Sequence, residues 1–282
     1  MEIAAQGPYP EQPDRSDTVA GRRIDWTGRD VFAGVCYFIG IFIAGQIATI
    51  PFLIAYGDTS RPFFASAFIF GAAVEVAVAV VAASLTFRKY GGGWAQIGFG
   101  PVTNSTLLWA LGAFIAAFAL AGTYGVLVEE FGPHFLKSEC AEQIPFEVRD
   151  DRALLALASL VVIAFAPVCE ELFFRGFLFT GLAKAWGLVP GIVASALLFA
   201  GAHLLYKSFL PIALVGMVFA FTYSRSRNIL STMLAHMAFN GLSIAFIAGG
   251  SCPQEPSPGA WLGALHGAAA VVASALPSAL GR

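Results

Sequence analysis

Long apolar stretches dominate this chain and constrain its fold more than any other feature. A helix needs about 20 apolar residues to cross the hydrocarbon core of a membrane, and seven stretches approach or exceed that length. Another apolar stretch, rich in small residues, is a candidate for an eighth. The pattern predicts an all-α fold, a polytopic membrane helical bundle of 7–8 transmembrane helices. The predicted spans are 31–56, 62–87, 105–128, 153–174, 188–206, 208–224 and 229–249, with 260–276 as the eighth candidate.

The composition supports a membrane protein. Of all residues, 57% are hydrophobic and only 12% are charged, whereas soluble domains average about 45–50% and 25%. A net charge of -2 provides no basic surface, so we expect no nucleic-acid partner. Residues 1–30 are polar, contain Pro and Gly, and lack the apolar core of a signal peptide. They are predicted to form a disordered cytoplasmic tail, and 31–282 a single transmembrane domain.

The positive residues of the connecting loops predict the orientation. Cytoplasmic loops carry an excess of Lys and Arg, and the loop between 129 and 152 is predominantly acidic. A cytoplasmic N-terminus places most of the positive residues inside. They are Arg15, Arg22, Arg23, Arg29, Arg88, Lys89, Lys184, Arg225 and Arg227.

Three ionisable residues fall at the end of the fourth predicted span, in the run APVCEELFFRGF. Charged side chains are costly in lipid, so they mark candidate functional sites. Glu171 and Arg175 are four residues apart and share one helix face, where they can pair. Glu170 points about 100° away and has no local partner, so an apolar pocket would suit it to general acid or base catalysis. A purely structural ion pair is the alternative for Glu171.

Two later spans each carry a histidine. Phe199 and His203 are four residues apart on the fifth span, and His236 and Asn240 repeat that spacing on the seventh. Imidazole and amide groups can donate to an oxyanion, and imidazole can bind a metal. Either histidine alone is more often a buried core residue, but polar groups on three spans together favour a functional site. Glu75, the acid within the second span, either lines a cavity or pairs with a neighbouring helix.

These motifs, taken in order, resemble the CPBP family of intramembrane proteases, which includes the type II CAAX prenyl endopeptidases and bacteriocin-processing and immunity proteins. The resemblance rests on Glu170-Glu171-x-x-x-Arg175, Phe199-x-x-x-His203 and His236-x-x-x-Asn240. It covers about 153–249, the expected protease core. The resemblance implies a bundle of about eight spans, whose catalytic groups line a cavity reached from the cytoplasm or from lipid.

The resemblance also implies a role for each motif residue. Glu170 is expected to activate the hydrolytic water with help from His203. His236 and Asn240 are expected to hold the oxyanion of the tetrahedral intermediate. The residues expected to support and orient the site are Glu171, Arg175 and Phe199.

Metal dependence stays open at this point. The chain lacks an HExxH motif, in which two histidines one turn apart bind zinc. In a zinc enzyme His203 and His236 would be ligands, with Glu170 or Asn240 as a weak third. We favour water activated by glutamate without a committed cofactor, and a divalent metal such as zinc is the alternative.

The resemblance implies an endopeptidase in a prokaryotic cell membrane. Its expected partners are the lipid bilayer and a peptide or membrane-protein substrate, for which a lipidated C-terminus is one option. Two other classes stay open, namely a non-catalytic scaffold or immunity protein of the same fold, and a proton-coupled transporter. Transporters usually show internal repeats or paired broken helices, which are not evident here.

The depths of the predicted site residues do not agree with one another. If Arg175 marks the inner membrane edge, Glu170 lies about 8 Å inside it at about 1.5 Å per residue. His203, counted from Leu188, lies deeper. Either the fifth helix starts late, or it is tilted, or a boundary is wrong.

The four cysteines divide into two pairs. Cys36 and Cys169 lie within spans and are predicted to be unpaired. Cys140 and Cys252 are predicted to lie outside the membrane, where disulfides can form. A bridge between these two is a hypothesis.

Overall fold

The computed structural model describes residues 18–133, 136 and 145–248. Within these ranges it is a bundle of helices, which confirms the predicted all-α membrane fold. Six helical segments are long and apolar enough to cross a membrane. The long single helices are α1 (Gly28–Tyr56), α2 (Arg61–Ala83), α3 (Asn104–Phe131), α9 (Phe209–Ser226) and α10 (Ile229–Ala248), with α8 (Leu188–Ala202) shorter.

The sixth long segment is a composite helix that runs from Arg152 to Trp186. It was predicted to end at 174, with Arg175 at the inner membrane edge, and that boundary is wrong. The charged side chains do not end the span because they are buried as a pair. Its parts are α5 (Arg152–Ser159), η6 (Leu160–Phe165), α6 (Ala166–Glu170), η7 (Glu171–Phe179) and α7 (Thr180–Trp186), of which η6 and η7 are π-helices.

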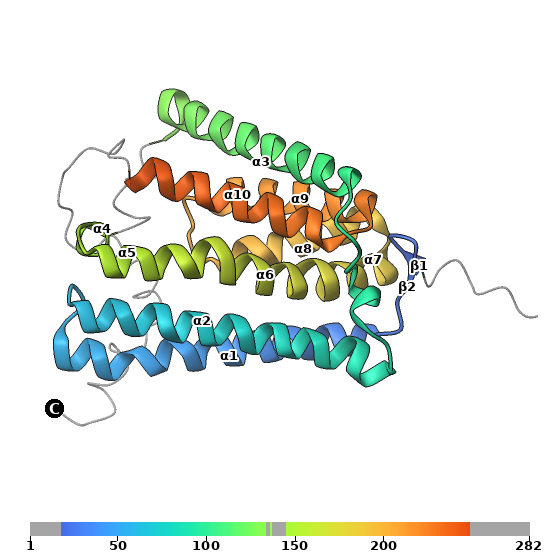
Figure 1. Cartoon of the computed structure of the whole chain (residues 1–282), viewed down its shortest axis with the longest axis horizontal. Helices are drawn as coiled ribbons and strands as arrows, with labels where there is room; N and C mark the ends of the chain where they lie inside the picture. Colours follow the sequence, from blue (N-terminus) through green and yellow to red (C-terminus); the bar gives the residue numbers. More distant parts are fainter. Residues whose placement is uncertain (1–17, 134–135, 137–144, 249–282) are drawn as a thin grey trace, which may run out of the picture.

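The helices pack on both sides of this composite helix (Figure 1). The hairpin of α1 and α2 lies on one side, with α2 contacting α5, α6 and η7. Helices α3, α9 and α10 lie on the other side, and α8 packs against α7 and α9. The main core lies around η7, where Phe173 packs against Phe38 with ring centroids 5.3 Å apart. The composite helix is therefore the central element of the bundle.

Side chains at the ends of the membrane-spanning helices fix where several of these helices begin. Ser60 Oγ accepts from the backbone N–H of Phe63 at the start of α2, and Asp151 caps α5, as N-cap residues do. At the start of α1, Asp30 Oδ1 pairs with Lys89 Nζ at 2.5 Å. This hydrogen bond raises the pKa of Lys89. Lys89 follows the short π-helix η2 (Ser84–Arg88), so the pair ties the two ends of the α1–α2 hairpin together.

The segment before α1 was predicted to belong to a disordered tail, and for residues 18–27 that prediction is wrong. Strands β1 (Thr18–Val19) and β2 (Arg22–Arg23) form a small antiparallel hairpin. The Trp26 side chain is buried, and its Nε1–H donates to the carbonyl of Phe177 at 3.1 Å. Burial of this indole compensates for the cost of ordering the segment. Residues 1–17 lie outside the described residues.

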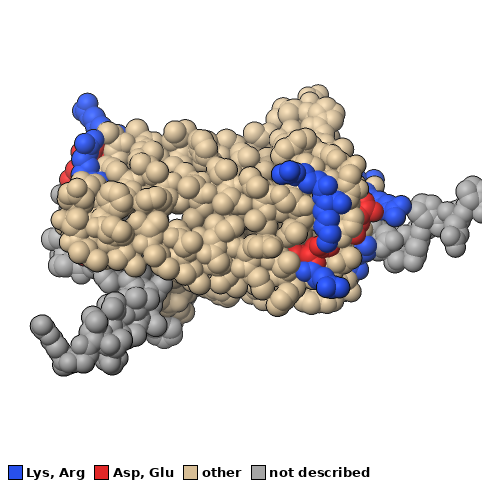
Figure 2. All heavy atoms as spheres, turned by 90° about the horizontal axis from the view of Figure 1, so that it is seen from below, with Lys and Arg blue, Asp and Glu red and all other residues tan. Residues whose placement is uncertain are grey.

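Charged side chains gather at the two ends of the bundle (Figure 2). On the face in view, the surface between the two ends shows no Lys, Arg, Asp or Glu. At one end Arg22 donates to the Tyr223 hydroxyl at 2.9 Å, and Lys184 donates to the carbonyl of Ile24 at 2.7 Å. The chain is thus an integral, multi-pass membrane protein. Its orientation remains a prediction.

Two short helices complete the described fold, η3 (Trp94–Ile97) and α4 (Phe146–Asp150). Cys36 and Cys169 are free thiols, as predicted. The hypothetical Cys140–Cys252 bridge and the candidate span at 260–276 lie outside the described residues.

Candidate active site

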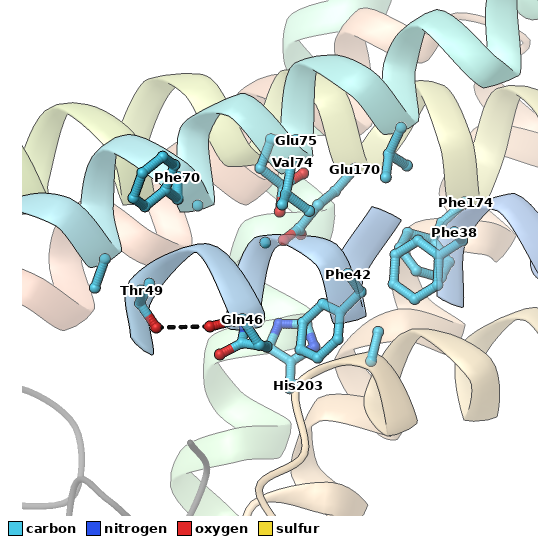
Figure 3. A pocket seen from close by; sticks show the side chains of 15 residues that line it. Phe38, Phe42, Gln46, Thr49, Phe70, Val74, Glu75, Glu170, Phe174 and His203 are labelled. Atoms are coloured by element: carbon cyan, nitrogen blue, oxygen red, sulfur yellow. Dashed lines mark hydrogen bonds between the residues drawn. The ribbon is translucent and has the colours of Figure 1, made fainter. Parts of the chain in front are cut away.

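A cavity of about 230 Å³ opens between the α1–α2 hairpin and the composite helix, close to the end of α8. Aromatic side chains form much of its wall, among them Phe42 and Phe174. Figure 3 shows that the side chains of Glu75, Glu170 and His203 point into it from three different helical segments. The polar side chains that line it are Gln46, Thr49, Glu75, Glu170 and His203.

Glu170 stands at the junction of α6 and η7. Its side chain is 16% exposed, and its Oε2 lies 3.7 Å from His236 Nε2. That distance exceeds a hydrogen bond, so the two side chains are neighbours without a hydrogen bond between these atoms. A π-helix is rare and occurs often at functional sites. Here it begins where the chain turns one carboxylate towards the cavity and the next into the core.

Glu171 faces the core and pairs with Arg175, as the sequence predicted. Glu171 Oε1 lies 2.9 Å from Arg175 Nη1, and the two side chains are 0% and 2% exposed. The same Oε1 lies 3.0 Å from His236 Nδ1. Within the described residues, Glu171 Oε2 and Arg175 Nη1 have no hydrogen-bond partner. The Glu171–Arg175 contact is therefore an ion pair by distance, without hydrogen-bond geometry at Nη1.

Aromatic rings hold the guanidinium of Arg175 in place. Its central carbon lies 4.3 Å from the centroid of the Phe199 ring and 5.3 Å from that of Phe219, as in cation–π contacts. The Phe199 ring also lies 4.8 Å from the ring of His203 and 5.9 Å from that of His236. Phe199 is thus the side chain that links the ion pair to both histidines.

His203 follows the last residue of α8, and its ring reaches the cavity. Its Nδ1 lies 2.8 Å from the carbonyl oxygen of Phe199. A carbonyl can only accept, so Nδ1–H is the donor, and in this tautomer Nε2 is the nitrogen that carries the lone pair. Leu204, the next residue, has a φ of 54°, which is uncommon for a bulky side chain and occurs often at functional sites.

Asn240 is the predicted site residue that the structure places apart from the others. Its Nδ2 donates to the carbonyl of Val162 at 2.9 Å, and it does not line the cavity. Val162 lies in the π-helix η6, five residues before Pro167, which has no N–H to offer the preceding turn. The Asn240 amide therefore satisfies a backbone carbonyl of the composite helix.

The structure removes the disagreement over depth. The composite helix ends at Trp186, so Glu170 lies 16 residues, or about 24 Å, from that end. His203 lies 15 residues, or about 22 Å, from Leu188, where α8 starts on the way back. The two residues are therefore at the same depth. The error lay in treating Arg175 as the membrane edge.

Glu75 is the cavity residue to which the sequence assigned two equal alternatives. It lines the cavity and interacts electrostatically with Glu170. This position favours the first alternative, a group that faces the cavity. The signal available in the sequence was an acid in the middle of an otherwise apolar span.

The residues present do not form a recognisable metal site. In the described ranges, no group of three or more His, Cys, Asp and Glu side chains is placed to hold a metal ion. Both nitrogens of His236 face glutamates, and Nδ1 of His203 faces a carbonyl. This arrangement does not fit His203 and His236 as two ligands of one ion.

Fold and cavity define a polytopic membrane protein with a carboxylate- and imidazole-lined site between its helices. Residues 152–242 match the family model described as type II CAAX prenyl endopeptidase Rce1-like. The match confirms the resemblance drawn from the three motifs, all of which fall inside this region. This region is therefore similar to the CAAX-type intramembrane proteases.

Three curated bacterial proteins are similar to about half of the chain. YdiL of Bacillus subtilis (strain 168), whose name gives membrane peptidase as a provisional assignment, is 28% identical over 138 residues, or 48% of this chain. An uncharacterized 24.3 kDa protein of Escherichia coli is 27% identical over 52% of this chain. An uncharacterized protein of Mycoplasma capricolum is 28% identical over 49%.

These alignments cover 54%, 67% and 43% of the three relatives' own lengths. The chain thus spans about half to two thirds of the curated relatives that it matches. No solved structure gives a significant match to the chain.

Proposed function

We propose that the chain is an intramembrane endopeptidase that hydrolyses a peptide bond with water activated by Glu170. One observation carries the proposal: Glu170 and His203, from distant parts of the sequence, line the same cavity at the same depth between apolar helices. An apolar cavity strengthens electrostatic interactions with a reacting group. It also excludes competing water from the site.

In the proposed reaction, the Glu170 carboxylate accepts a proton from water as the water oxygen attacks the scissile carbonyl carbon. The lone pair of His203 Nε2 accepts a hydrogen bond from the second hydrogen of that water, which orients the oxygen for attack. Each contribution of this kind is worth about 10²–10⁴-fold in rate. The Nδ1–H bond to Phe199 keeps the imidazole in the required tautomer.

The buried pair of Glu171 and Arg175 orients the site through His236. His236 lies between the two glutamates, with Nδ1 towards Glu171 and Nε2 towards Glu170. This position supports a role in holding the Glu170 carboxylate. The oxyanion role expected for His236 and Asn240 would need both side chains to turn from their present partners towards the cavity.

The substrate that fits this site is a peptide or membrane protein reached through the bilayer, and a lipidated C-terminus remains one option. A prokaryotic cell membrane is the proposed location, in line with the bacterial relatives. The positive residues gathered by the N-terminal hairpin support a cytoplasmic N-terminus. A non-catalytic scaffold or a transporter of the same fold would bind or move a ligand without breaking a peptide bond.

The test is cleavage by purified protein in lipid vesicles. A library of membrane-anchored peptides is offered to the native protein and to the Glu170→Gln variant, and products are identified by mass spectrometry. We expect the variant to lose at least about 10²-fold in rate. The matched control is Glu147→Gln, the same substitution at an exposed position of α4. Equal cleavage by native protein and the Glu170→Gln variant would refute the proposal.

A further inference from the structure

Glu75 brings a second carboxyl group into the cavity from outside the three motifs. It lies on α2, about halfway along the span, whereas the motif residues lie on the composite helix, α8 and α10. Glu75, Glu170 and His203 all line the cavity (Figure 3). The carboxyl groups of Glu75 and Glu170 are close enough to interact electrostatically.

Two carboxyl groups in such a place do not both ionise. A like charge nearby and an apolar environment each disfavour the charged form. The nearest buried cation, Arg175, is turned away to Glu171 and the Phe199 ring. No Lys or Arg side chain is among the residues that line the cavity in the described part of the chain. Paired carboxyl groups in acid–base sites of this kind hold one proton between them.

The proposed reaction sets which of the two groups carries the proton at the start. Glu170 Oε2 lies 3.7 Å from His236 Nε2. Glu75 is surrounded by apolar helix surface, with Phe42, Phe70 and Val74 also lining the cavity. Because the proposed base, Glu170, has to start the reaction ionised, Glu75 starts it as the protonated partner.

We infer that Glu75 is the general acid of the proposed peptidase reaction and protonates the leaving amine. This inference rests on the proposed function. Water loses a proton to Glu170 as its oxygen bonds to the carbonyl carbon, and the carbonyl becomes an oxyanion. When the oxyanion collapses, the C–N bond breaks and the nitrogen takes the proton of Glu75. The products are a carboxylic acid and an amine.

The proton balance explains why the two groups are neighbours. Before the reaction Glu170 is ionised and Glu75 protonated, and after it the reverse holds. The total charge of the pair does not change during turnover. Transfer of one proton from Glu170 to Glu75 within the cavity restores the starting state, so no group outside the cavity has to titrate.

The test compares leaving groups, because a general acid matters only where the leaving group needs a proton. An amine must be protonated as it departs, whereas a nitrophenolate departs without help. The variant is Glu75→Gln, which keeps the shape of the side chain but cannot give up a proton. Each preparation is offered a peptide amide and the matching nitrophenyl ester. The ratio of the two kcat values is independent of the fraction of protein that is folded.

We expect Glu75→Gln to lower kcat for the amide by about 10²-fold or more and to change kcat for the ester by less than about threefold. Glu75→Asp, which keeps a carboxyl group, should hold the ester-to-amide ratio within about tenfold of the native ratio. Glu147→Gln should match the native protein with both substrates. Equal losses with amide and ester, or full amide activity in Glu75→Gln, would overturn the inference.

A failure of this inference can be told apart from a failure of the proposed function. Glu170→Gln should lose both substrates, since both need activated water. If Glu170→Gln keeps native activity, the proposed function is wrong whatever Glu75 does. If Glu170→Gln is inactive and Glu75→Gln shows no preference for the ester, only the role of Glu75 is wrong.

Discussion

Replacing Glu171 with glutamine should destabilise the protein more than any other single substitution at the site. The substitution removes the negative charge beside Arg175, whose guanidinium is only 2% exposed. At 2.9 Å, two unit charges attract by roughly 6 kcal/mol with an effective dielectric constant near 20. The loss also leaves a cation uncompensated in the core, which in buried pairs costs about 3–5 kcal/mol. A loss of about 3–5 kcal/mol lowers the folded-to-unfolded ratio by about two to nearly four powers of ten.

The measurement is the free energy of unfolding in mixed micelles, from SDS titrations followed by far-UV circular dichroism. The control is Glu170→Gln, because Glu170 borders the cavity and lies 3.7 Å from an imidazole instead of pairing with Arg175. We expect that control to change stability by less than about 1 kcal/mol. The double variant Glu171→Leu with Arg175→Met should recover most of the loss, since apolar residues of similar volume often replace buried pairs at no cost.

A Glu171→Gln variant as stable as the native protein would refute this reasoning. It would mean that the ion pair is solvated or absent in the membrane. A double variant less stable than Glu171→Gln alone would also contradict it, because the cost would then not come from the uncompensated guanidinium.

Contacts at three other residues predict the effects of substitutions there. His203→Ala should lower the cleavage rate at least about 10²-fold without loss of folded protein, as measured by kcat and thermal unfolding. Asn240→Ala should lower the free energy of unfolding by about 1 kcal/mol, because it leaves the Val162 carbonyl unpaired. The same variant should keep kcat within about tenfold of the native value. A stable Asn240→Ala variant with a larger loss in kcat would favour the oxyanion role. The pKa of Asp151 lies below its ordinary 3.8, chiefly because the backbone N–H of Leu154 donates to the carboxylate. The ionised carboxylate therefore stabilises the fold above pH 3.8, and this stabilisation is lost as the pH falls through the lowered pKa. The stability difference between native protein and Asp151→Asn should therefore shrink on acidification, and a difference independent of pH would exclude this contribution.

Most of the helices could be predicted from the sequence because a membrane-spanning helix requires a long run of apolar residues. The ends of α1, α2 and α3 agree with the predicted spans to within about four residues, as boundary estimates usually do. The span predicted for the composite helix ended too early because a charged residue ordinarily marks the end of a span. Burial of the Glu171–Arg175 pair, which depends on aromatic rings from α8 and α9, is not visible in local sequence.

The candidate site could be predicted only where spacing along one helix decides the geometry. The pairing of Glu171 with Arg175 follows from a separation of four residues. The approach of Glu75 to Glu170 depends on how α2 packs against the composite helix, and the bond from Asn240 to Val162 depends on how α10 does. Such contacts between distant segments leave no periodic signal in a single sequence.

The most direct test of water activation by Glu170 compares peptide C-termini in membranes from two strains. One strain carries the native chain, and the other carries Glu170→Gln at equal abundance. Quantitative mass spectrometry after hydrolysis in ¹⁸O-labelled water identifies new termini even when the substrate is unidentified. We predict a set of labelled C-termini that is present with the native chain and absent with Glu170→Gln. Identical sets of labelled termini from the two membranes would contradict the assignment of Glu170 as the catalytic base.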